Sequence, residues 1–156
     1  MPYSLANFNL SLAAALAAAA GMAMGSELWA NQAPEADAAA VYSVLRVYGG
    51  PVPEGLLRVP AASVQAMTTA KSAAAALDAA NRLYDALYDA ENLPRHHWVI
   101  AGILIGGDGA IAADPDNDWE VRLVIPGAPP GQIGVDARGF AQVVFNFDIR
   151  FQPKEI

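Results

Sequence analysis

Three aspartates, Asp114, Asp116 and Asp118, follow one another at every second position of the sequence. Calcium-binding loops of the EF-hand type begin with this D-x-D-x-D spacing, since it directs several carboxylates at one cation. Such a loop also needs glycine at its sixth position and glutamate at its twelfth, where this chain has Trp119 and Ile125. The sequence therefore excludes an EF-hand. It leaves a weak cation site open and favours a solvated acidic loop.

The chain has two histidines, His96 and His97, which are adjacent. Neighbouring residues of a strand point to opposite faces, so this pair is poorly placed to share a metal ion, and no HExxH motif accompanies it. The sequence has no cysteine, which excludes a disulfide, a thiolate zinc site and a cysteine nucleophile. We therefore predict surface or interface positions for both histidines, and neither a resident metal nor a cofactor.

Glycines gather at residues 49–50 and 106–109, as they do in phosphate-binding loops. Neither segment has the GxxxxGK[ST] or GxGxxG pattern before a helix, so we predict turns in both places. Ser63 and Ser72 lack the sequence context of a nucleophile elbow. No Ser-His-Asp set can be named either, and we therefore predict that the protein is not an enzyme.

The chain is weakly charged and acidic. Charged residues make up 16% of its 156 residues, whereas a charged fraction of roughly 25% is typical. The net charge of the chain is −7. We therefore expect that other subunits cover part of the surface. The nine Lys and Arg residues are dispersed, which argues against gripping of nucleic-acid phosphates. An acidic surface can still face DNA, because it repels the phosphates and lets the polymer slide.

The elements that must position these residues begin with a predicted amphipathic helix over about residues 4–23. Its apolar face recurs at steps of three or four residues, at Leu5, Phe8, Leu12 and Leu16. Gly21 and Gly25 mark its end. The first basic residue of the chain is Arg46, so the basic region of a secretory signal is missing. The apolar run is also short for a transmembrane helix.

A second helix is predicted over about residues 70–90, with an apolar stripe at Ala73, Leu77, Ala80, Tyr84 and Leu87. Strand-like composition or alternation marks residues 28–29, 41–48, 62–69, 98–105, 119–126 and 140–151. Residues 106–118 are predicted to form a polar loop. The alternation in residues 119–126 predicts two opposite faces, one with Val121, Leu123 and Ile125 and the other with Glu120, Arg122 and Val124. The strand at 41–48 has apolar residues on both faces, so we expect it inside the sheet.

The clearest alternation is that of residues 140–151, where apolar Val143, Phe145, Phe147, Ile149 and Phe151 lie on one face. Residues 127–139 are rich in Gly and Pro and are expected to form a hairpin or a protruding arm. Because helices and strands do not alternate regularly, the fold class predicted for residues 1–156 is a single α+β domain. It has a mostly antiparallel β-sheet with two α-helices packed on one face, plus extended loops or arms.

Three stretches share their order and apolar pattern with one protein family. After the first helix comes the strand Val41–Val47 with the loop Gly49-Gly50-Pro51-Val52-Pro53. The second helix ends in Ala-Asn-Arg-Leu-Tyr-Asp-Ala-Leu-Tyr-Asp, residues 80–89. The last strand is Phe-Ala-Gln-Val-Val-Phe-Asn-Phe-Asp-Ile-Arg-Phe, residues 140–151. In this order and spacing, most of the chain resembles the tail terminator (minor tail protein) family of long-tailed bacteriophages.

The resemblance implies a structural protein of the virion tail, in its neck region, that is assembled in the host cytoplasm. Family members form a hexameric ring at the head-proximal end of the tail tube. The ring stops tube polymerisation and offers a docking surface to the head-tail connector, or stopper, protein, while DNA passes through its lumen without specific binding. The expected partners are therefore other copies of the chain, the tail tube protein and the connector, with no membrane.

Two sets of residues are candidates for roles in such an assembly. Extended arms can join subunits by strand addition, and the candidates in the loops 49–60 and 127–139 are Pro51, Pro53, Pro129, Pro130 and Gln132. A negative lumen would keep DNA from sticking, and its candidate lining is Asp108, Asp114, Asp116 and Asp118. Two alternatives stay open. One is another neck or tail component, such as a head-completion protein or tail-tube subunit, and the other is a non-viral small-ligand-binding domain.

Overall fold

The computed structural model of the protein describes residues 5–31, 40–48, 61–88, 98–105, 111–114 and 118–154. Within them the chain forms helix α1 over Leu5–Ala20 and helix α2 over Ala73–Tyr88. The first five strands are β1 (Leu28–Ala30), β2 (Val41–Tyr48), β3 (Ala61–Ala70), β4 (Trp98–Ile100) and β5 (Ile103–Ile105). The remaining strands are β6 (Ile111–Ala113), β7 (Trp119–Pro126), β8 (Gly131–Val135) and β9 (Ala141–Pro153).

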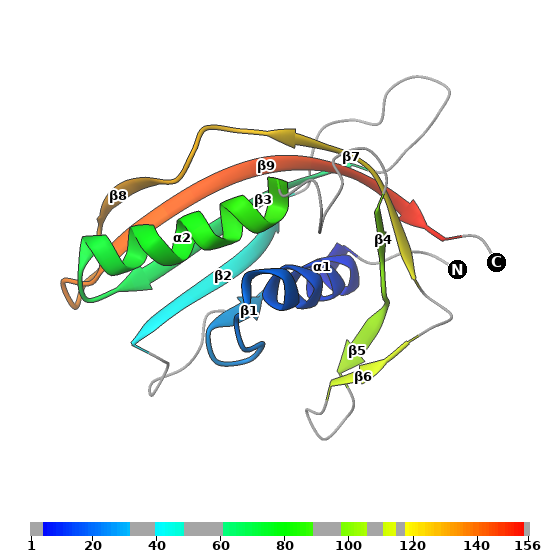
Figure 1. Ribbon diagram of the computed structural model, residues 1–156, viewed down its shortest axis with the longest axis horizontal. Coiled ribbons are helices and arrows are strands. Elements are labelled where there is room, and N and C mark those ends of the chain that lie inside the picture. Colours follow the sequence, from blue (N-terminus) through cyan, green and yellow to red (C-terminus); the bar gives the residue numbers. More distant parts are fainter. Residues whose placement is uncertain are drawn as a thin grey trace.

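Seven of these strands form one sheet, with neighbours in the order β1-β2-β3-β9-β7-β4 and with β8 also paired to β9. The parallel β1–β2 pair is the exception in an otherwise antiparallel arrangement. Strands β5 and β6 form a separate two-stranded sheet. The main sheet curves, and both helices lie on its concave face (Figure 1). The predicted α+β class is therefore confirmed.

Strand β9 runs through the middle of the sheet and supplies much of the core. Its alternate residues Val143, Phe145, Phe147, Ile149 and Phe151 are buried beneath the helices. On β3, Val64 lies beside Phe147 and Ala66 beside Phe145, so the two strands present one continuous apolar face. The opposite face of β9 carries the half-buried or exposed Gln142, Asn146, Asp148 and Arg150. The period-two alternation predicted for residues 140–151 is confirmed.

Of the apolar face predicted for helix α1, Phe8, Leu12 and Leu16 are fully buried, and the side chain of Leu5 lies outside what the structure describes. The helix ends at Ala20 because Gly21 takes a left-handed conformation, with φ of +69°. The amide of Met22 then donates to the carbonyl of Ala17 at 2.9 Å, the 6→1 hydrogen bond of a Schellman turn. A carbonyl of the last helical turn is thereby satisfied without a further turn of helix.

Helix α2 begins after Ser72, whose Oγ accepts a hydrogen bond from the amide of Ala75 at 3.1 Å. Such a cap satisfies one of the amides at the start of the helix. The helix buries a face rich in alanine, at Ala76, Ala79, Ala80, Leu83, Ala86 and Leu87. Small side chains let the helix approach Ala141 and Val143 closely. The predicted stripe is therefore wrong at Ala73, which is exposed, and at Leu77, which is 40% exposed.

Residues 98–105 do not form the single strand that their apolar run predicted. The chain turns at Gly102 and divides the run into β4 and β5. Two hydrogen bonds fix the turn, one from the Gly102 amide to Asp118 Oδ1 at 2.9 Å and one from the Asp114 amide to the Gly102 carbonyl at 2.8 Å. Strand β6 also lies within the segment predicted as a polar loop, so that prediction is wrong for Ile111–Ala113.

Strand β7 has the predicted bounds, but its alternation changes at a bulge. Its register with β9 shifts between Val121 and Leu123, so Arg122 has no partner residue in the ladder. A bulge exchanges the faces of the residues that follow it. Val124 is therefore buried and Ile125 is 39% exposed, which reverses the sides predicted for these two residues.

Candidate subunit-assembly surface

The segment from Gly127 to Pro130 joins β7 to the exposed strand β8. The amide of Gly127 donates to the carbonyl of Asn146 in β9 at 3.1 Å. A Cβ at this position would lie 2.3 Å from that carbonyl oxygen, which is closer than real Cβ contacts. Glycine therefore lets the chain lie directly against β9 as it passes from β7 to β8.

Strand β8 pairs antiparallel with β9, from Gly131 opposite Val144 to Val135 opposite Ala141. Residues 127–139 were predicted to form a hairpin or a protruding arm, and they supply one strand of a hairpin whose other strand, β9, begins at Ala141. Within the described residues β9 is the one strand that pairs with β8, so the other edge of β8 has no strand beside it. A bulge lies between Gln132 and Gly134. Ile133 and Val135 are 61% and 62% exposed, the two most exposed large apolar side chains among the described residues.

The turn between β8 and β9 is tied by one carboxylate. Asp136 Oδ1 accepts hydrogen bonds from the amides of Arg138 and Phe140, at 2.9 and 3.0 Å. Asp136 Oδ2 lies 2.8 Å from Nη2 of Arg138, and Nη2 is also 3.1 Å from the hydroxyl of Tyr42 in β2. The Arg138 guanidinium lies 4.4 Å from the centre of the Phe140 ring. These contacts connect the turn to a strand two positions away in the sheet.

The same contacts shift the pKa values of Asp136 and Arg138. The side-chain hydrogen bond from Arg138 lowers the pKa of Asp136 below its usual 3.8, and the backbone hydrogen bonds of Phe140 and Arg138 lower it further, against an opposing effect of burial. The hydrogen bond to Asp136 raises the pKa of Arg138. Both groups are therefore charged near neutral pH, so the turn keeps its ion pair.

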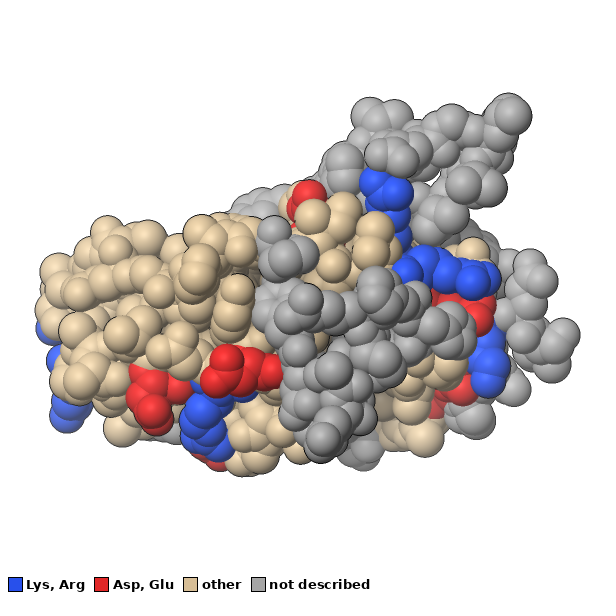
Figure 2. All heavy atoms as spheres, turned by 45° about the horizontal axis from the view of Figure 1, so that its top comes forward, with Lys and Arg blue, Asp and Glu red and all other residues tan. Residues whose placement is uncertain are grey.

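The β8 strip, defined here as residues Gly127–Val135, contains no Lys, Arg, Asp or Glu. The exposed Leu77 lies on α2, the helix that contacts β8. Figure 2 shows a broad tan area at the left end of the molecule, with basic side chains at its left edge and acidic and basic side chains along its lower margin. An exposed strand edge with large apolar side chains and no charge is typical of a surface that another protein covers.

Three of the candidate arm residues are described, and all three belong to the β8 strip. Pro129 and Gln132 are exposed, and Pro130 is half-buried. The proline and glycine content of the sequence located this segment, whereas it did not indicate that all five residues of β8, Ile133 and Val135 among them, are exposed. The other two candidate arm residues, Pro51 and Pro53, lie outside the described residues, as does the whole of the predicted loop 49–60.

Two of the candidate lumen residues, Asp114 and Asp118, lie at the base of the β5–β6 hairpin. The Gly102 amide donates to the Asp118 carboxylate, and the Gly102 carbonyl accepts from the Asp114 amide, so these two residues hold the corner between β4 and β5. Asp108 and Asp116 lie outside the described residues, as do His96 and His97. The lumen role of the four aspartates stays a prediction, and a structural role is now added for Asp114 and Asp118.

The serines considered as nucleophiles have structural partners. Ser63 Oγ donates to Asp148 Oδ1 at 2.7 Å across the β3–β9 pair, and Ser72 caps α2. In the described part of the chain, no group of three His, Asp or Glu residues is arranged to hold a metal ion. No helix there is long and apolar enough to cross a membrane.

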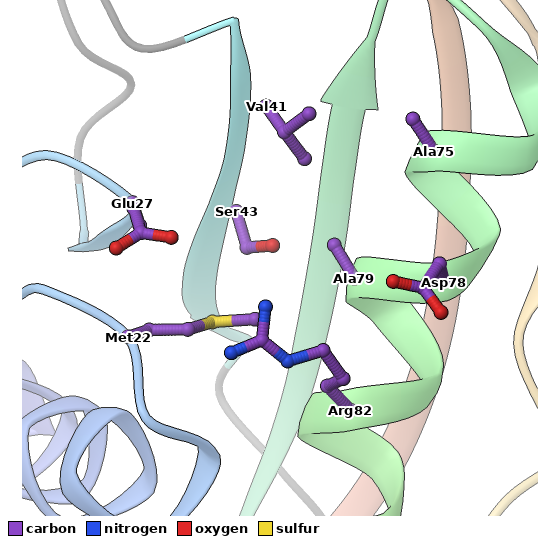
Figure 3. A pocket seen from close by; sticks show the side chains of 8 residues that line it. All are labelled: Met22, Glu27, Val41, Ser43, Ala75, Asp78, Ala79 and Arg82. Carbon is purple, nitrogen blue, oxygen red and sulfur yellow. The ribbon is translucent and has the colours of Figure 1, made fainter.

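A pocket of about 230 Å³ opens between the end of α1, strand β2 and helix α2. Glu27, Asp78 and Arg82 stand around it, and its other lining residues are Met22, Val41, Ser43, Ala75 and Ala79 (Figure 3). Arg82 Nη2 donates to the carbonyl of Ala20 at 2.8 Å, so this side chain caps the end of α1. Ser43 Oγ is 2.7 Å from Thr68 Oγ1. Arg82 and Ser43 at the pocket therefore join neighbouring elements.

A buried asparagine, which sequence periodicity does not reveal, connects the helix to the sheet. Asn9 is fully buried on α1. Its Nδ2 donates to the carbonyl of Leu45 at 2.8 Å and to Oδ1 of Asn31 at 2.9 Å. The amide of Asn31 donates to the same Leu45 carbonyl at 2.8 Å. A buried polar side chain needs such partners, so Asn9 fixes where α1 lies on the sheet.

No family model matches the sequence, and no curated protein matches it.

Proposed function

We propose that this protein is a structural component of the tail of a long-tailed bacteriophage, a tail terminator. In this proposal, copies of the chain form a ring that caps the tail tube and joins it to the head connector. The observation that carries the proposal is the β8 strip, an uncharged and exposed strand on a chain of net charge −7. The resemblance of the chain to the tail terminator family supplies the biological setting.

A closed ring requires a heterologous contact, in which two different surfaces of the same protein meet. The β8 strip is suited to be one of them, because Ile133 and Val135 present apolar area that would otherwise face water. It also lacks like charges that would repel a neighbouring copy. The low charge content of the whole chain is in keeping with a protein whose surface is covered in an assembly.

The acidic balance of the chain suits the passage of DNA through such a ring. A negative lumen repels phosphates, so the polymer moves without being held. The candidate residues for the wall are Asp108, Asp114, Asp116 and Asp118, of which Asp114 and Asp118 bond to Gly102. A lumen lined by Lys or Arg in a structure of the assembled ring would contradict this part of the proposal.

Negative-stain electron microscopy of the purified full chain tests the proposal. A tail terminator is expected to give discrete rings with an open centre and to cap tail tubes when these are added. A tail-tube subunit would instead polymerise into long tubes. Particles that remain monomeric at every concentration, or absence of the protein from purified virions, would contradict the proposal.

A further inference from the structure

The pocket between α1, β2 and α2 has a carboxylate on each of two facing sides. Glu27 lies in the segment that leads from α1 into β1, and Asp78 lies on α2 (Figure 3). Glu27 Oε1 accepts a hydrogen bond from the amide of Ala23 at 3.1 Å. Among the described residues, Glu27 Oε2 and both carboxylate oxygens of Asp78 have no partner. Three carboxylate oxygens at the pocket can therefore accept hydrogen bonds from a ligand.

Arg82, the basic residue of the lining, is directed at the end of α1. Its Nη2 lies 2.8 Å from the carbonyl oxygen of Ala20 and 3.4 Å from that of Gly21. The last carbonyls of a helix carry a partial negative charge, which the guanidinium balances. Arg82 forms no ion pair with Glu27 or Asp78. Because two carboxylates face this single cation, the lining as a whole is negative.

The rest of the lining combines apolar side chains with a buried hydroxyl. The apolar part consists of Met22, Val41, Ala75 and Ala79. Ser43 is 1% exposed, and its Oγ is 2.7 Å from Thr68 Oγ1. A hydroxyl can donate one hydrogen bond and accept two, so Ser43 has capacity for a further bond. This lining matches a ligand with a short hydrocarbon stem and a polar, positively charged head.

We infer that the pocket binds a primary alkylammonium group, with its stem along the apolar side chains and its head toward Glu27 and Asp78. An ammonium has three donors and no acceptor, which suits carboxylate oxygens that lack donors. The volume of about 230 Å³ is below the roughly 300–1,000 Å³ of pockets for drug-sized ligands, so a ligand of this small size fits. Free aliphatic amines and lysine side chains both carry such a group.

Other occupants match the lining less well. An anion would be repelled by the two carboxylates, and a purely apolar ligand would cover them without offering a donor, which costs free energy. Calcium takes six to eight oxygen ligands, whereas the described residues include no group of three His, Asp or Glu arranged to hold a metal ion. No residue of the β8 strip lines the pocket, so the inference goes beyond the proposed function and does not depend on it.

An NMR titration of the full chain tests the inference. The methyl group of Met22 and the amides of Ala75 and Ala79 are the reporters, n-butylammonium is the probe, and n-butanol is the uncharged control of the same length. We expect saturable shifts of the reporters with the amine and none with the alcohol. Cadaverine and Nα-acetyl-lysine-N-methylamide distinguish the two sources. Tighter binding of the lysine derivative assigns the pocket to a lysine side chain of another protein, and tighter binding of cadaverine assigns it to a free amine.

Variants of the two carboxylates give the second test. Asp78→Asn and Glu27→Gln remove the charges, and the new glutamine keeps an oxygen for the Ala23 amide. Each should weaken n-butylammonium binding about tenfold, the effect of losing a charge-assisted hydrogen bond. Asp85→Asn is the matched control, because Asp85 is exposed on the same helix and does not line the pocket. Circular dichroism checks the fold of each variant.

Two results would overturn the inference. One is wild-type affinity for n-butylammonium in both carboxylate variants, and the other is the absence of saturable shifts with every amine. Neither result bears on ring assembly, which electron microscopy of the same protein measures separately.

Discussion

The rings of Phe8 and Phe151 stack with their centroids 3.6 Å apart and their planes 2° apart. Phe8 lies in the first helix and Phe151 near the end of the last strand, so the contact closes the domain between the two ends of the described chain. Trp119 packs edge-on against both rings, with centroid distances of 5.3 and 5.7 Å. Aromatic groups in such arrangements add to the stability that burial provides.

The substitution Phe8→Ala is expected to remove this contact and leave a cavity. We predict a loss of about 3–5 kcal/mol in the free energy of unfolding, the usual cost of removing a buried phenylalanine. Urea denaturation followed by tryptophan fluorescence measures it, with Leu77→Ala as a control that truncates an exposed side chain. Equal losses in the two variants would show that Phe8 is not buried.

The substitution Phe147→Asp tests the register of β9. Because Phe147 is buried, the change places an unpaired carboxylate in the core, at an expected cost of several kcal/mol. The neighbouring Asn146 is exposed on the other face, so Asn146→Asp should change stability by no more than about 0.5 kcal/mol. Thermal unfolding measures the stability of both variants. An unfolding midpoint of Phe147→Asp equal to that of the wild type would refute the register of β9.

Local periodicity predicted correctly the elements in which buried and exposed residues repeat at one regular spacing along the chain. Residues 140–151 alternate without interruption because β9 pairs with β3 without a register shift from Ala141 to Arg150. The sequence could not reveal the turn at Gly102, since its cause is a hydrogen bond to Asp118, sixteen residues away. It also could not reveal that Leu77 is exposed, because the approach of α2 to Ala141 and Val143 determines which side of the helix is buried.

The substitution Gly127→Ala is expected to displace the β8 strip. Its Cβ would collide with the Asn146 carbonyl, which belongs to the backbone and cannot move alone. We predict a loss of about 1–3 kcal/mol, the usual cost of a steric conflict, and faster hydrogen exchange of the β8 amides. Gly131→Ala is the matched control, because a Cβ there meets nothing within 4 Å. Unchanged exchange rates in Gly127→Ala would contradict the close approach.

The turn at Asp136 is expected to depend on pH. Since the folded state lowers the pKa of this carboxyl below 3.8, its ionised form stabilises the folded turn at pH values above 3.8. The contribution is lost as the pH falls through the lowered pKa, when the ion pair with Arg138 breaks. An NMR titration of the Phe140 amide should report this pKa, and Asp136→Asn should abolish the transition. A midpoint at or above 3.8 in the wild type would contradict the contacts described.

The candidate assembly surface was only partly predictable. Glycine and proline content located the arm at residues 127–139, because these residues interrupt regular strands. The sequence could not indicate that β8 and β7 share one edge of β9, opposite residues 141–144 and 147–153 respectively. In that arrangement no described strand lies beside the other edge of β8, and Ile133 and Val135 are exposed.

The most direct test of assembly through the β8 strip compares the mass in solution of the wild-type protein with that of a variant that carries charged residues in the strip. Sedimentation velocity should show a closed oligomer of the 16.3 kDa wild-type chain, and a monomer for the double variant Ile133→Asp/Val135→Asp. Both substituted residues are exposed, so the melting temperature of the variant should stay close to that of the wild type. A wild-type monomer, or a variant that assembles as the wild type does, would contradict the account.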